Sequence, residues 1–379
     1  MRYPCLAAIL VLASSLLLGA CSDGQQDPAD YGIEKIEVTL STENQPQLLH
    51  GGIGKLKVPA RLKAADQWFS GHLSLSGNFT IDAWKSSFRF DATEMIPGFE
   101  FRSMKLSAQT QDPTFLRTTL AAHVFSALSV PIPATRPVAL HINGVYAGLY
   151  LAIERINVDF YRKRGFDPDR IFQAKTNAAD FGEEMVVDPE HGFEPKGGAF
   201  YPQELKRLAA ETARPADAEQ LTRIGAVLEL DNAISHLAVR LFIRDCDGFA
   251  NNMYLHRDRS DGKIRFSGWD WERAWGSQCD LASLFRQNLL FAKLIEHPSL
   301  RAALTLKLKL LQGMFPPSRL KELGSAESAR LRTSTLSDPY FITFGIDSGA
   351  DSEALFASVE LWSQQIDEFV RGTPIAPSL

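Results

Sequence analysis

Apolar and polar residues alternate with a period of two along the first third of the chain, and this pattern predicts β-strands. The alternation is visible at Ile36 and Val38, at Leu73 and Leu75, and at Phe88 and Phe90. Successive side chains of a strand point to opposite faces, so each of these runs presents one apolar face to a core. We therefore expect an antiparallel sheet between Glu34 and Phe90.

A hairpin is predicted farther along the chain. Asn143-Gly144 separates two apolar runs, Val138–Ile142 and Val145–Ile153, and this dipeptide is strongly preferred in two-residue hairpin turns. In the second strand, Tyr150 and Glu154 share one face because they lie an even number of residues apart. The sheet is therefore expected to carry the Glu154 carboxylate on a defined face.

The period changes to that of a helix in the second half of the chain. Asp231 precedes apolar residues at helical spacing up to Ile243, which predicts a helix with Asp231 as its N-cap. Residues 182–225 contain glycine, proline and charged side chains, and we expect an irregular insertion there with one helix near Gln203 to Glu211. These patterns predict an α+β protein, with a β-rich part at 34–181 and a helical part at 182–379.

The most informative polar residues lie in DGFANNMYLHRDRSDGKIRFSGWDWERAWG, residues 247–276. Asp247, Asn252 and Asp270 follow the order Asp-x-x-x-x-Asn and then, beyond a hairpin, a second Asp. Protein kinases use this order to place a catalytic base and two Mg²⁺ ligands. Carboxylate and amide oxygens are hard donors of the kind that Mg²⁺ takes. The spacing, more than the residue types, makes this segment the candidate catalytic and metal site.

The register of this hairpin decides whether two of these residues face each other. Met253–Arg257 and Lys263–Trp269 are the expected strands, joined by a turn at Ser260-Asp261-Gly262. A three-residue turn places Asn252 opposite Asp270, with Cβ atoms about 5 Å apart, whereas a two-residue turn moves Asp270 to the other face. The metal-site hypothesis therefore predicts the longer turn or a bulge in the second strand. The alternative interpretation is a solvated hairpin whose tryptophans are core residues.

Together with this segment, four further blocks resemble the CotH kinase family of atypical protein-kinase-like proteins, in the family's order. They are SGNFTIDAWKSSFRF (Ser76–Phe90), MKLSAQTQDPTFLRTTLAAHVFSAL (Met104–Leu128), VALHINGVYAGLYLAIERI (Val138–Ile156) and RIFQAKTNAADF (Arg170–Phe181). The resemblance covers about Ser70 to Gly276 and implies an atypical protein-kinase-like fold, with an antiparallel-sheet N-terminal lobe and a mainly helical C-terminal lobe. Two positions depart from the family pattern: Ser76 stands where an arginine usually precedes the glycine, and Glu272 where a second Asp is usual.

The resemblance implies a phosphotransferase that uses ATP and Mg²⁺ to phosphorylate a Ser or Thr hydroxyl of a protein. Asp247 would orient or deprotonate the acceptor hydroxyl, and Asn252 and Asp270 would hold Mg²⁺. Asp245 is the rival base, but Asp247 has the five-residue spacing to Asn252 that kinases show. We therefore prefer Asp247 as the catalytic residue.

Four further residues are candidates for binding the nucleotide: Lys85, Arg117, Glu154 and Lys175. Lys85 is expected to point a cation into a cleft, as the kinase lysine does toward phosphates; an exposed edge-strand lysine is the alternative. Arg117, on a helix that Asp112-Pro113 is expected to begin, is interpreted as a phosphate or carboxylate ligand, or else as a surface arginine. Glu154 is expected to pair with Lys85 or Lys175, or else to form a salt bridge on the sheet surface.

The N-terminus has the pattern of a bacterial lipoprotein. Residues 1–20 contain Arg2 and an apolar run that ends in Gly-Ala before Cys21, and this run is too short to span a membrane. We expect a signal peptide at 1–20, lipidation of Cys21 and a tether at 21–33. The protein would then be held in the cell envelope outside the cytoplasm, on the outer membrane if the cell has two membranes. An ordinary secretory signal is the alternative.

Composition and charge exclude few classes of protein. The chain has 379 residues, of which 45% are hydrophobic and 22% charged, and these values are ordinary for globular proteins. Its net charge of −5 argues against a nucleic-acid partner, which would need a basic face. Cys246 and Cys279 flank the candidate site, and in an oxidising compartment they either form a disulfide or remain buried thiols.

A lipoprotein outside the cytoplasm meets little ATP, so two other functions stay open. One is a surface-anchored binding or structural module that keeps the fold without turnover. The other is a metal-dependent transferase of another group, such as a nucleotidyl or glutamyl group. P-loop, zincin and nucleophile-elbow motifs do not occur in the sequence. The expected partners are therefore a nucleotide, an unidentified protein acceptor in the cell envelope and, through Cys21, the membrane.

Overall fold

The structure, a computed structural model, describes residues 30–44, 56–77, 83–197, 202–276 and 279–372. The chain divides into two compact units. Unit 1 contains the chain up to Phe115, Ala134–Arg155 and Ser325–Asp351, and unit 2 contains Leu116–Pro133, Ile156–Gly324 and the chain from Ser352. Both units contain helices and strands, which confirms the α+β class. The division differs from the predicted boundary after residue 181 because the chain returns to each unit more than once.

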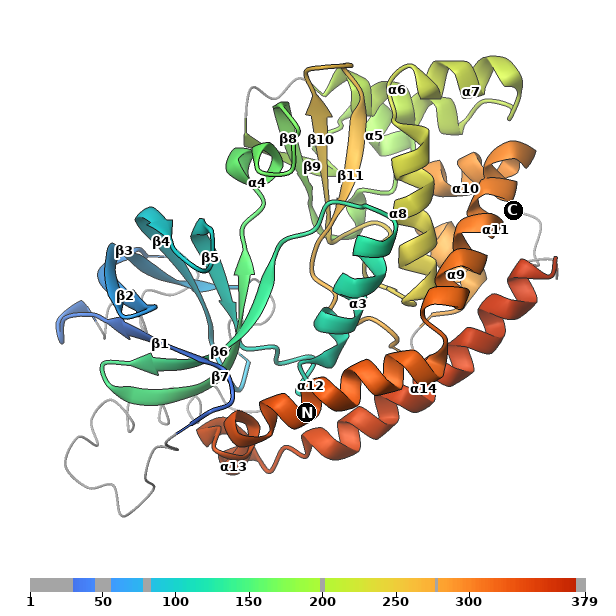
Figure 1. Cartoon of the computed structure of the whole chain (residues 1–379). Coiled ribbons are helices and arrows are strands. Elements are labelled where there is room, and N and C mark those ends of the chain that lie inside the picture. The colour runs from blue at the N-terminus through green and yellow to red at the C-terminus, as the bar shows by residue number, and fades with distance from the viewer. Residues whose placement is uncertain (1–29, 45–55, 78–82, 198–201, 277–278, 373–379) are drawn as a thin grey trace. The chain divides into compact units, whose positions relative to one another are not determined.

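Seven strands of unit 1 form a closed barrel with the order β1-β2-β3-β4-β5-β7-β6 (Figure 1). They are β1 (Glu34–Thr39), β2 (Val58–Ala64), β3 (Gln67–Ser76), β4 (Ser87–Ile96), β5 (Phe101–Ser107), β6 (Thr135–Ile142) and β7 (Val145–Glu154). Neighbouring strands are antiparallel except β1 and β6, which pair in parallel and close the barrel, with Ile36 opposite Leu140. The expected antiparallel sheet is present, but its two edges are joined to each other.

The strands can close into a barrel because the apolar side chains of the period-two pattern point into its interior. In β2, Val58, Ala60, Leu62 and Ala64 are buried, and the residues between them are more exposed. The turn at Asn143-Gly144 joins β6 and β7 with φ of 51° and 82°, the left-handed conformation that a type I′ turn needs. The predicted hairpin is therefore confirmed.

The start of the described chain packs onto unit 1. Tyr31, which falls in the predicted tether, is buried, with its ring 4.6 Å from that of Tyr146. Its carbonyl accepts a hydrogen bond from the hydroxyl of Ser334 at 2.9 Å. The predicted signal peptide 1–20 and the lipidation residue Cys21 lie outside the described residues. Among the helices of the described ranges, none combines the length and the apolarity that crossing a bilayer requires.

Unit 2 contains a four-stranded sheet with the order β11-β10-β8-β9, in which β10 and β11 are the strands of the expected hairpin. Its strands are β8 (Pro168–Ala174), β9 (Phe193–Gly197), β10 (Met253–Asp258) and β11 (Ile264–Gly268). Its helices are α3 (Leu116–Ala127), α4 (Val158–Arg162), α5 (Glu183–Val187), α6 (Gln203–Thr212), α7 (Ala218–Gly225), α8 (Leu230–Phe242), α9 (Leu281–Arg286), α10 (Leu289–Glu296) and α11 (Pro298–Met314), with a 3₁₀ turn at Thr176–Ala178. Helix α8 packs against β11 (Figure 1).

Three C-terminal helices complete the fold. α12 (Pro317–Leu336) and α14 (Ser348–Val370) contribute residues to both units, and α13 (Pro339–Phe344) belongs to unit 1. Asp338 caps α13 by accepting hydrogen bonds from the amides of Tyr340 and Phe341. The carboxylate of this N-cap also pairs with the ammonium group of Lys85.

Two predicted helix starts are wrong. Helix α8 is capped by the side chain of Glu229, which accepts from the amides of Asp231 and Asn232, so Asp231 lies inside the first turn. Helix α3 begins at Leu116. The carboxylate of Asp112 instead accepts from the hydroxyl of Thr114 in a turn that precedes the helix.

Candidate functional site

The predicted hairpin is present as β10 and β11, but its register differs from the expected one. Met253 pairs with Gly268, one residue away from the pairing that would place Asn252 opposite Asp270. The prediction that these two side chains face each other across the ladder is therefore wrong. Both residues lie just beyond the ends of the paired strands.

The side chain of Asp258 explains the altered register. Its Oδ1 accepts hydrogen bonds from the amide of Ser260 at 2.9 Å and from the Ser260 hydroxyl at 2.5 Å. The amide of Asp258 still donates to the carbonyl of Lys263 at 3.0 Å, so four residues, Arg259–Gly262, form the turn. An Asp that bonds the chain two residues on favours such a turn, and the extra residue moves the ladder by one position.

Asn252 and Asp270 both have left-handed backbone conformations, with φ of 46° and 57°. Such conformations are uncommon for residues other than glycine, although asparagine and aspartate adopt them more often than other residues do, and they occur in turns and at functional sites. Because the two residues leave the ladder in this way, the register of β10 and β11 does not set where their side chains point.

Asp247 and Asn252 form the core of the candidate site. Nδ2 of Asn252 donates to Oδ2 of Asp247 at 2.9 Å, and the Arg273 guanidinium lies 3.8 Å from the same carboxylate oxygen. The side chain of Asp247 is 26% exposed. This hydrogen bond turns the Nδ2 side of the amide toward the carboxylate and leaves Oδ1 of each residue, a hard oxygen donor, for another partner.

Arg240 connects Asp247 and Asp270 electrostatically. This residue of α8 is fully buried, and burial lowers its pKa to about 9, while the negative charges of Asp247 and Asp270 act in the opposite direction. Both carboxylates are therefore within Coulombic range of one guanidinium. That guanidinium also donates to the carbonyl of Asn252 at 2.5 Å. The tertiary structure thus gathers all three predicted residues around Arg240.

Asp245, the rival base, is fully buried and forms an ion pair with Arg240. A base must reach the hydroxyl whose proton it accepts, and the enclosed carboxylate of Asp245 does not meet this condition as well as the partly exposed Asp247. The geometry therefore favours the same choice that the spacing to Asn252 favours.

Arg240 is the residue of the candidate site that the sequence patterns did not indicate. It lies in the run ISHLAVRLFIRD, where a cation stands among apolar residues that face the core. A buried arginine needs partners of opposite charge or carbonyl groups. This conflict between a charge and the buried face of a helix was the available signal.

Lys85 lies in unit 1 with its ammonium group fully enclosed. Nζ is 2.5 Å from Oδ2 of Asp338 and 2.6 Å from the carbonyl of Leu149, and it lies 4.4 Å from the centre of the Tyr150 ring. Burial lowers the pKa of Lys85, and the charge of Asp338 counteracts this. Lys85 is therefore neither an edge-strand surface lysine nor a partner of Glu154.

The other predicted nucleotide-binding residues are placed as follows. Oε2 of Glu154, in unit 1, accepts from the amide of Ala134 at 3.1 Å. In unit 2, Arg117 donates to the carbonyl of Ala274, in the segment that follows Asp270. Lys175 donates to the main-chain carbonyl of Glu190. These two hydrogen bonds of Arg117 and Lys175 are with main-chain carbonyls of their own unit.

Cys246 and Cys279 form a disulfide, with Cα atoms 5.8 Å apart, which answers the question that the sequence left open. Because Asp247, Asn252 and Asp270 lie between the two cysteines, the covalent loop encloses the candidate site. Nη2 of Arg244 donates to the carbonyl of Cys279 at 2.7 Å and adds a polar contact beside the bridge.

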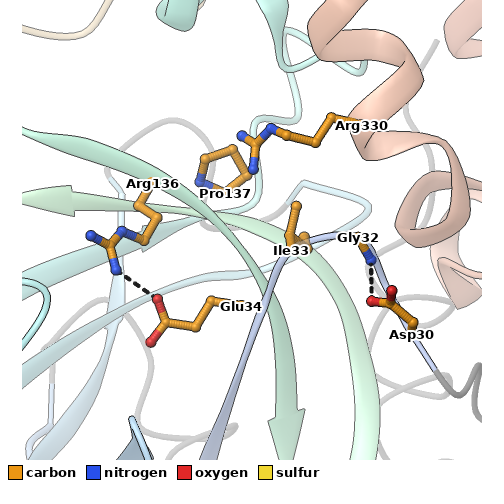
Figure 2. A pocket seen from close by; sticks show the side chains of 7 residues that line it. All are labelled: Asp30, Gly32, Ile33, Glu34, Arg136, Pro137 and Arg330. Atoms are coloured by element: carbon orange, nitrogen blue, oxygen red, sulfur yellow. Dashed lines mark hydrogen bonds and ion pairs between the residues drawn. The ribbon is translucent and has the colours of Figure 1, made fainter.

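Two other features bear on ligand binding. A cavity of about 500 Å³ opens in unit 1 between Glu34, Arg136 and Arg330, and Figure 2 shows Arg136 turned toward Glu34. None of the predicted site residues lines it. Within the described ranges, no three His, Cys, Asp or Glu side chains cluster as a metal site made of them would require. The candidate set of two carboxylates and one amide would need phosphate or water oxygens to complete a Mg²⁺ shell.

The fold and the candidate site define an α+β protein whose helix-rich unit gathers two aspartates and an asparagine around a buried arginine. The model of the CotH kinase protein family matches residues 73–367, and the chain belongs to this family of kinase-like proteins. Inner spore coat protein H of Bacillus subtilis (strain 168) is 25% identical over 301 residues, which cover 75% of this chain and 82% of that protein. The match extends beyond the sequence blocks into the C-terminal helices.

Proposed function

We propose that this protein is a kinase-like phosphotransferase that uses ATP and Mg²⁺ to phosphorylate a Ser or Thr hydroxyl of a protein. The observation that carries the proposal is the hydrogen bond between Asn252 Nδ2 and Asp247 Oδ2. It orders a carboxylate and an amide at the end of β10 and leaves an oxygen of each for a metal or an acceptor hydroxyl. Membership of the CotH kinase protein family supports the same assignment.

Each residue has a defined task in this proposal. Asp247 orients the acceptor hydroxyl and receives its proton, since it is the partly exposed carboxylate of the pair. Asn252 and Asp270 would hold Mg²⁺, which would neutralise the charge of the phosphates during transfer. No phosphate contact is assigned to Lys85, because its ammonium is enclosed with Asp338.

Titration calorimetry with ATP and Mg²⁺ tests binding, and transfer of a labelled γ-phosphate to a generic Ser/Thr protein or to the chain itself tests catalysis. The Asp247→Ala variant should bind nucleotide and lose transfer by 10²-fold or more. Asp261→Ala is the matched control, because Asp261 is an acidic residue in the turn of the same hairpin and, among the described residues, bonds Arg265 and the amide of Lys263. Absence of nucleotide binding at millimolar concentration would sink the proposal.

Asp270→Asn separates a metal ligand from a structural residue. Asparagine tolerates the left-handed backbone at position 270, so the exchange removes charge with little backbone cost. We expect metal-nucleotide affinity to fall at least tenfold while the melting temperature stays close to that of the wild type. A large drop in melting temperature with unchanged affinity would assign Asp270 to the fold.

A second candidate function is a binding or structural module without turnover. It is favoured by one observation: the lysine that was expected to reach phosphates is engaged with Asp338. The Bacillus subtilis relative is named as a spore coat protein, and such a name suits a structural role. Nucleotide binding without measurable transfer, equal in the wild type and Asp247→Ala, would favour this function.

The proposed location is the cell envelope, through a lipid on Cys21. The support is the sequence pattern before Cys21 and the disulfide between Cys246 and Cys279, because disulfides persist in oxidising compartments. Expression of the full chain and of Cys21→Ser, followed by detergent phase separation, tests it. Equal partition of both proteins into the aqueous phase would contradict the lipid anchor.

A further inference from the structure

Arg240 makes polar contacts on every side of its guanidinium although it is completely buried. Nη1 forms an ion pair with Asp245, and Nε donates to Nε2 of His236 at 3.3 Å. Burial holds the pKa of His236 well below its usual value, so the ring is neutral and accepts this hydrogen bond. The arginine is therefore fixed from its own helix and from the chain that follows it.

The remaining nitrogen of Arg240 bridges the two ends of the β10–β11 hairpin. Nη2 is 2.5 Å from the carbonyl of Asn252, just before β10, and 3.4 Å from the carbonyl of Trp269, which follows β11 and precedes Asp270. These are the positions where the backbone turns left-handed. A left-handed backbone outside glycine is held in place by its surroundings, and here one guanidinium contacts both segments.

The pair of Arg240 and Asp245 is a costly way to stabilise a core. Removing two charges from water costs several kcal/mol for each ion, and apolar residues of similar size are often as stabilising or more so. Oδ1 of Asp245 has no hydrogen-bond partner within the part of the chain that the structure describes, which adds to this cost. Stability alone therefore does not account for the pair, whereas its contacts with the hairpin ends do.

We infer that Arg240 and Asp245 are positioning residues for the metal site. Asp245 orients the guanidinium, and the guanidinium fixes the main chain beside Asn252 and Asp270 so that their side-chain oxygens meet one divalent cation. The inference rests on the proposed function, since it presumes that these two residues bind Mg²⁺. It extends that function by assigning the geometry of the site to a buried pair that touches neither metal nor substrate.

Replacing both Arg240 and Asp245 distinguishes an effect on the geometry of the metal site from an effect on the stability of the fold. Arg240→Met alone leaves the Asp245 carboxylate buried without its partner and should lower the melting temperature. The double variant Arg240→Met, Asp245→Val removes both charges and should recover most of that loss. Mn²⁺, a paramagnetic substitute for Mg²⁺, reports affinity by electron paramagnetic resonance, and we expect the double variant to bind it at least tenfold more weakly than the wild type. Hydrogen exchange at residues 252 and 270 should accelerate by a similar factor.

A purely structural role predicts the opposite combination. A double variant that melts like the wild type and also keeps its Mn²⁺ affinity and its exchange rates would overturn the inference and leave the proposed function intact. A wild-type protein that binds no Mn²⁺ would overturn both. The matched control is Arg265→Met, Asp261→Val, which removes a partly exposed pair of the same hairpin, 2.6 Å apart, and should leave Mn²⁺ affinity unchanged.

Arg240→Lys provides a second test if the double variant does not fold. Lysine keeps the positive charge beside Asp245 but lacks the planar fork that reaches several acceptors at once. We expect this variant to fold and to bind Mn²⁺ at least tenfold more weakly. Wild-type affinity in Arg240→Lys would show that a point charge suffices and that the two carbonyl contacts do not position the site.

Discussion

The ammonium of Lys85 and the carboxylate of Asp338 lie 2.5 Å apart in unit 1, although 253 residues separate them in the chain. Both side chains are fully buried. The same Asp338 oxygen also accepts from the amide of Leu149 at 2.7 Å, and its other oxygen caps α13. The pair therefore connects the chain before β4, strand β7 and a C-terminal helix within one unit.

Lys85→Met should destabilise the protein by about 3–5 kcal/mol, because Asp338 would remain as a buried charge without its partner. Urea unfolding of the wild type and the variant measures this. Lys63→Met is a suitable control, since Lys63 pairs with an almost fully exposed Asp66, and such pairs contribute little. Unchanged unfolding of Lys85→Met, with weaker nucleotide binding, would restore Lys85 as a phosphate ligand.

Gly248→Ala should disturb the pair of Arg240 and Asp245. A Cβ at this position would clash with Nη1 of Arg240 and lie 2.5 Å from Oδ2 of Asp245. We expect a loss of about 1–3 kcal/mol in the free energy of unfolding, measured by chemical denaturation. Gly313→Ala in α11 is the control: nothing lies within 4 Å of its added Cβ, and alanine should stabilise the helix there by about 0.5–1 kcal/mol.

His256 should make the protein sensitive to acid. Burial lowers its pKa to about 3, and the facing charges of Arg265, Asp258 and Asp261 partly offset one another. An unfolded histidine titrates near pH 6.5, so between these values the unfolded chain binds one more proton than the folded chain. The free energy of unfolding therefore falls by up to about 1.4 kcal/mol per pH unit as the pH decreases from 6.5 toward 3.

His256→Phe checks this, because neither ring nitrogen of His256 has a hydrogen-bond partner among the described residues and the ring packs on Tyr161 and Phe166. We expect the free energy of unfolding to change less steeply with pH between pH 4 and pH 6. The reduction in slope should correspond to at most one proton, which is about 1.4 kcal/mol per pH unit. Tyr161→Phe, in the same aromatic cluster, is the control and should leave the slope as it is. An unchanged slope in His256→Phe would contradict the prediction.

The disulfide joins Cys246 to Cys279, which are separated by 33 positions in the sequence, and so closes a covalent loop. A loop of this length stabilises the folded chain by about 2–4 kcal/mol, chiefly by restricting the unfolded state. The Cys246→Ala, Cys279→Ala variant should therefore unfold at a lower urea concentration than the oxidised wild type. Reducing agent should lower the urea midpoint of the wild type and leave that of the variant unchanged. Equal midpoints for the oxidised wild type, the reduced wild type and the variant would show that the disulfide adds no stability.

Much of the local structure was predictable, as three elements show. The Asn143-Gly144 turn, the strands of the β10–β11 hairpin and helix α8 lie close to where the residue patterns place them, because turn preferences and periodicity are local properties. The start of α8 was not predictable in the same way. The amide of Glu229 donates to the carbonyl of Ile264, and this contact with β11 places Glu229, not Asp231, at the cap.

The sequence predicted which residues form the candidate site, but it did not predict the strand register or the contacts that bring these residues together. The spacing of Asp247 and Asn252 pointed to two residues that the structure joins by a hydrogen bond. The register failed because one side chain, Asp258, adds a residue to the turn. The role of Arg240 in the site could not be predicted, because its partners His236, Asp245, Asn252 and Trp269 are too far apart in the sequence to lie in one short window.

The sequence by itself determined the alternating strands, the long helices, the order of the family's motifs and the oxygen-bearing residues of the candidate site. Only the tertiary structure decided that β1 pairs with β6 to close the barrel, that Lys85 pairs with Asp338 and that Arg240 bridges the hairpin ends. The physical reason is the distance along the chain over which each interaction acts. Backbone preferences and periodic burial act over a few residues, whereas ion pairs and strand pairing between distant segments depend on the packing of the whole unit.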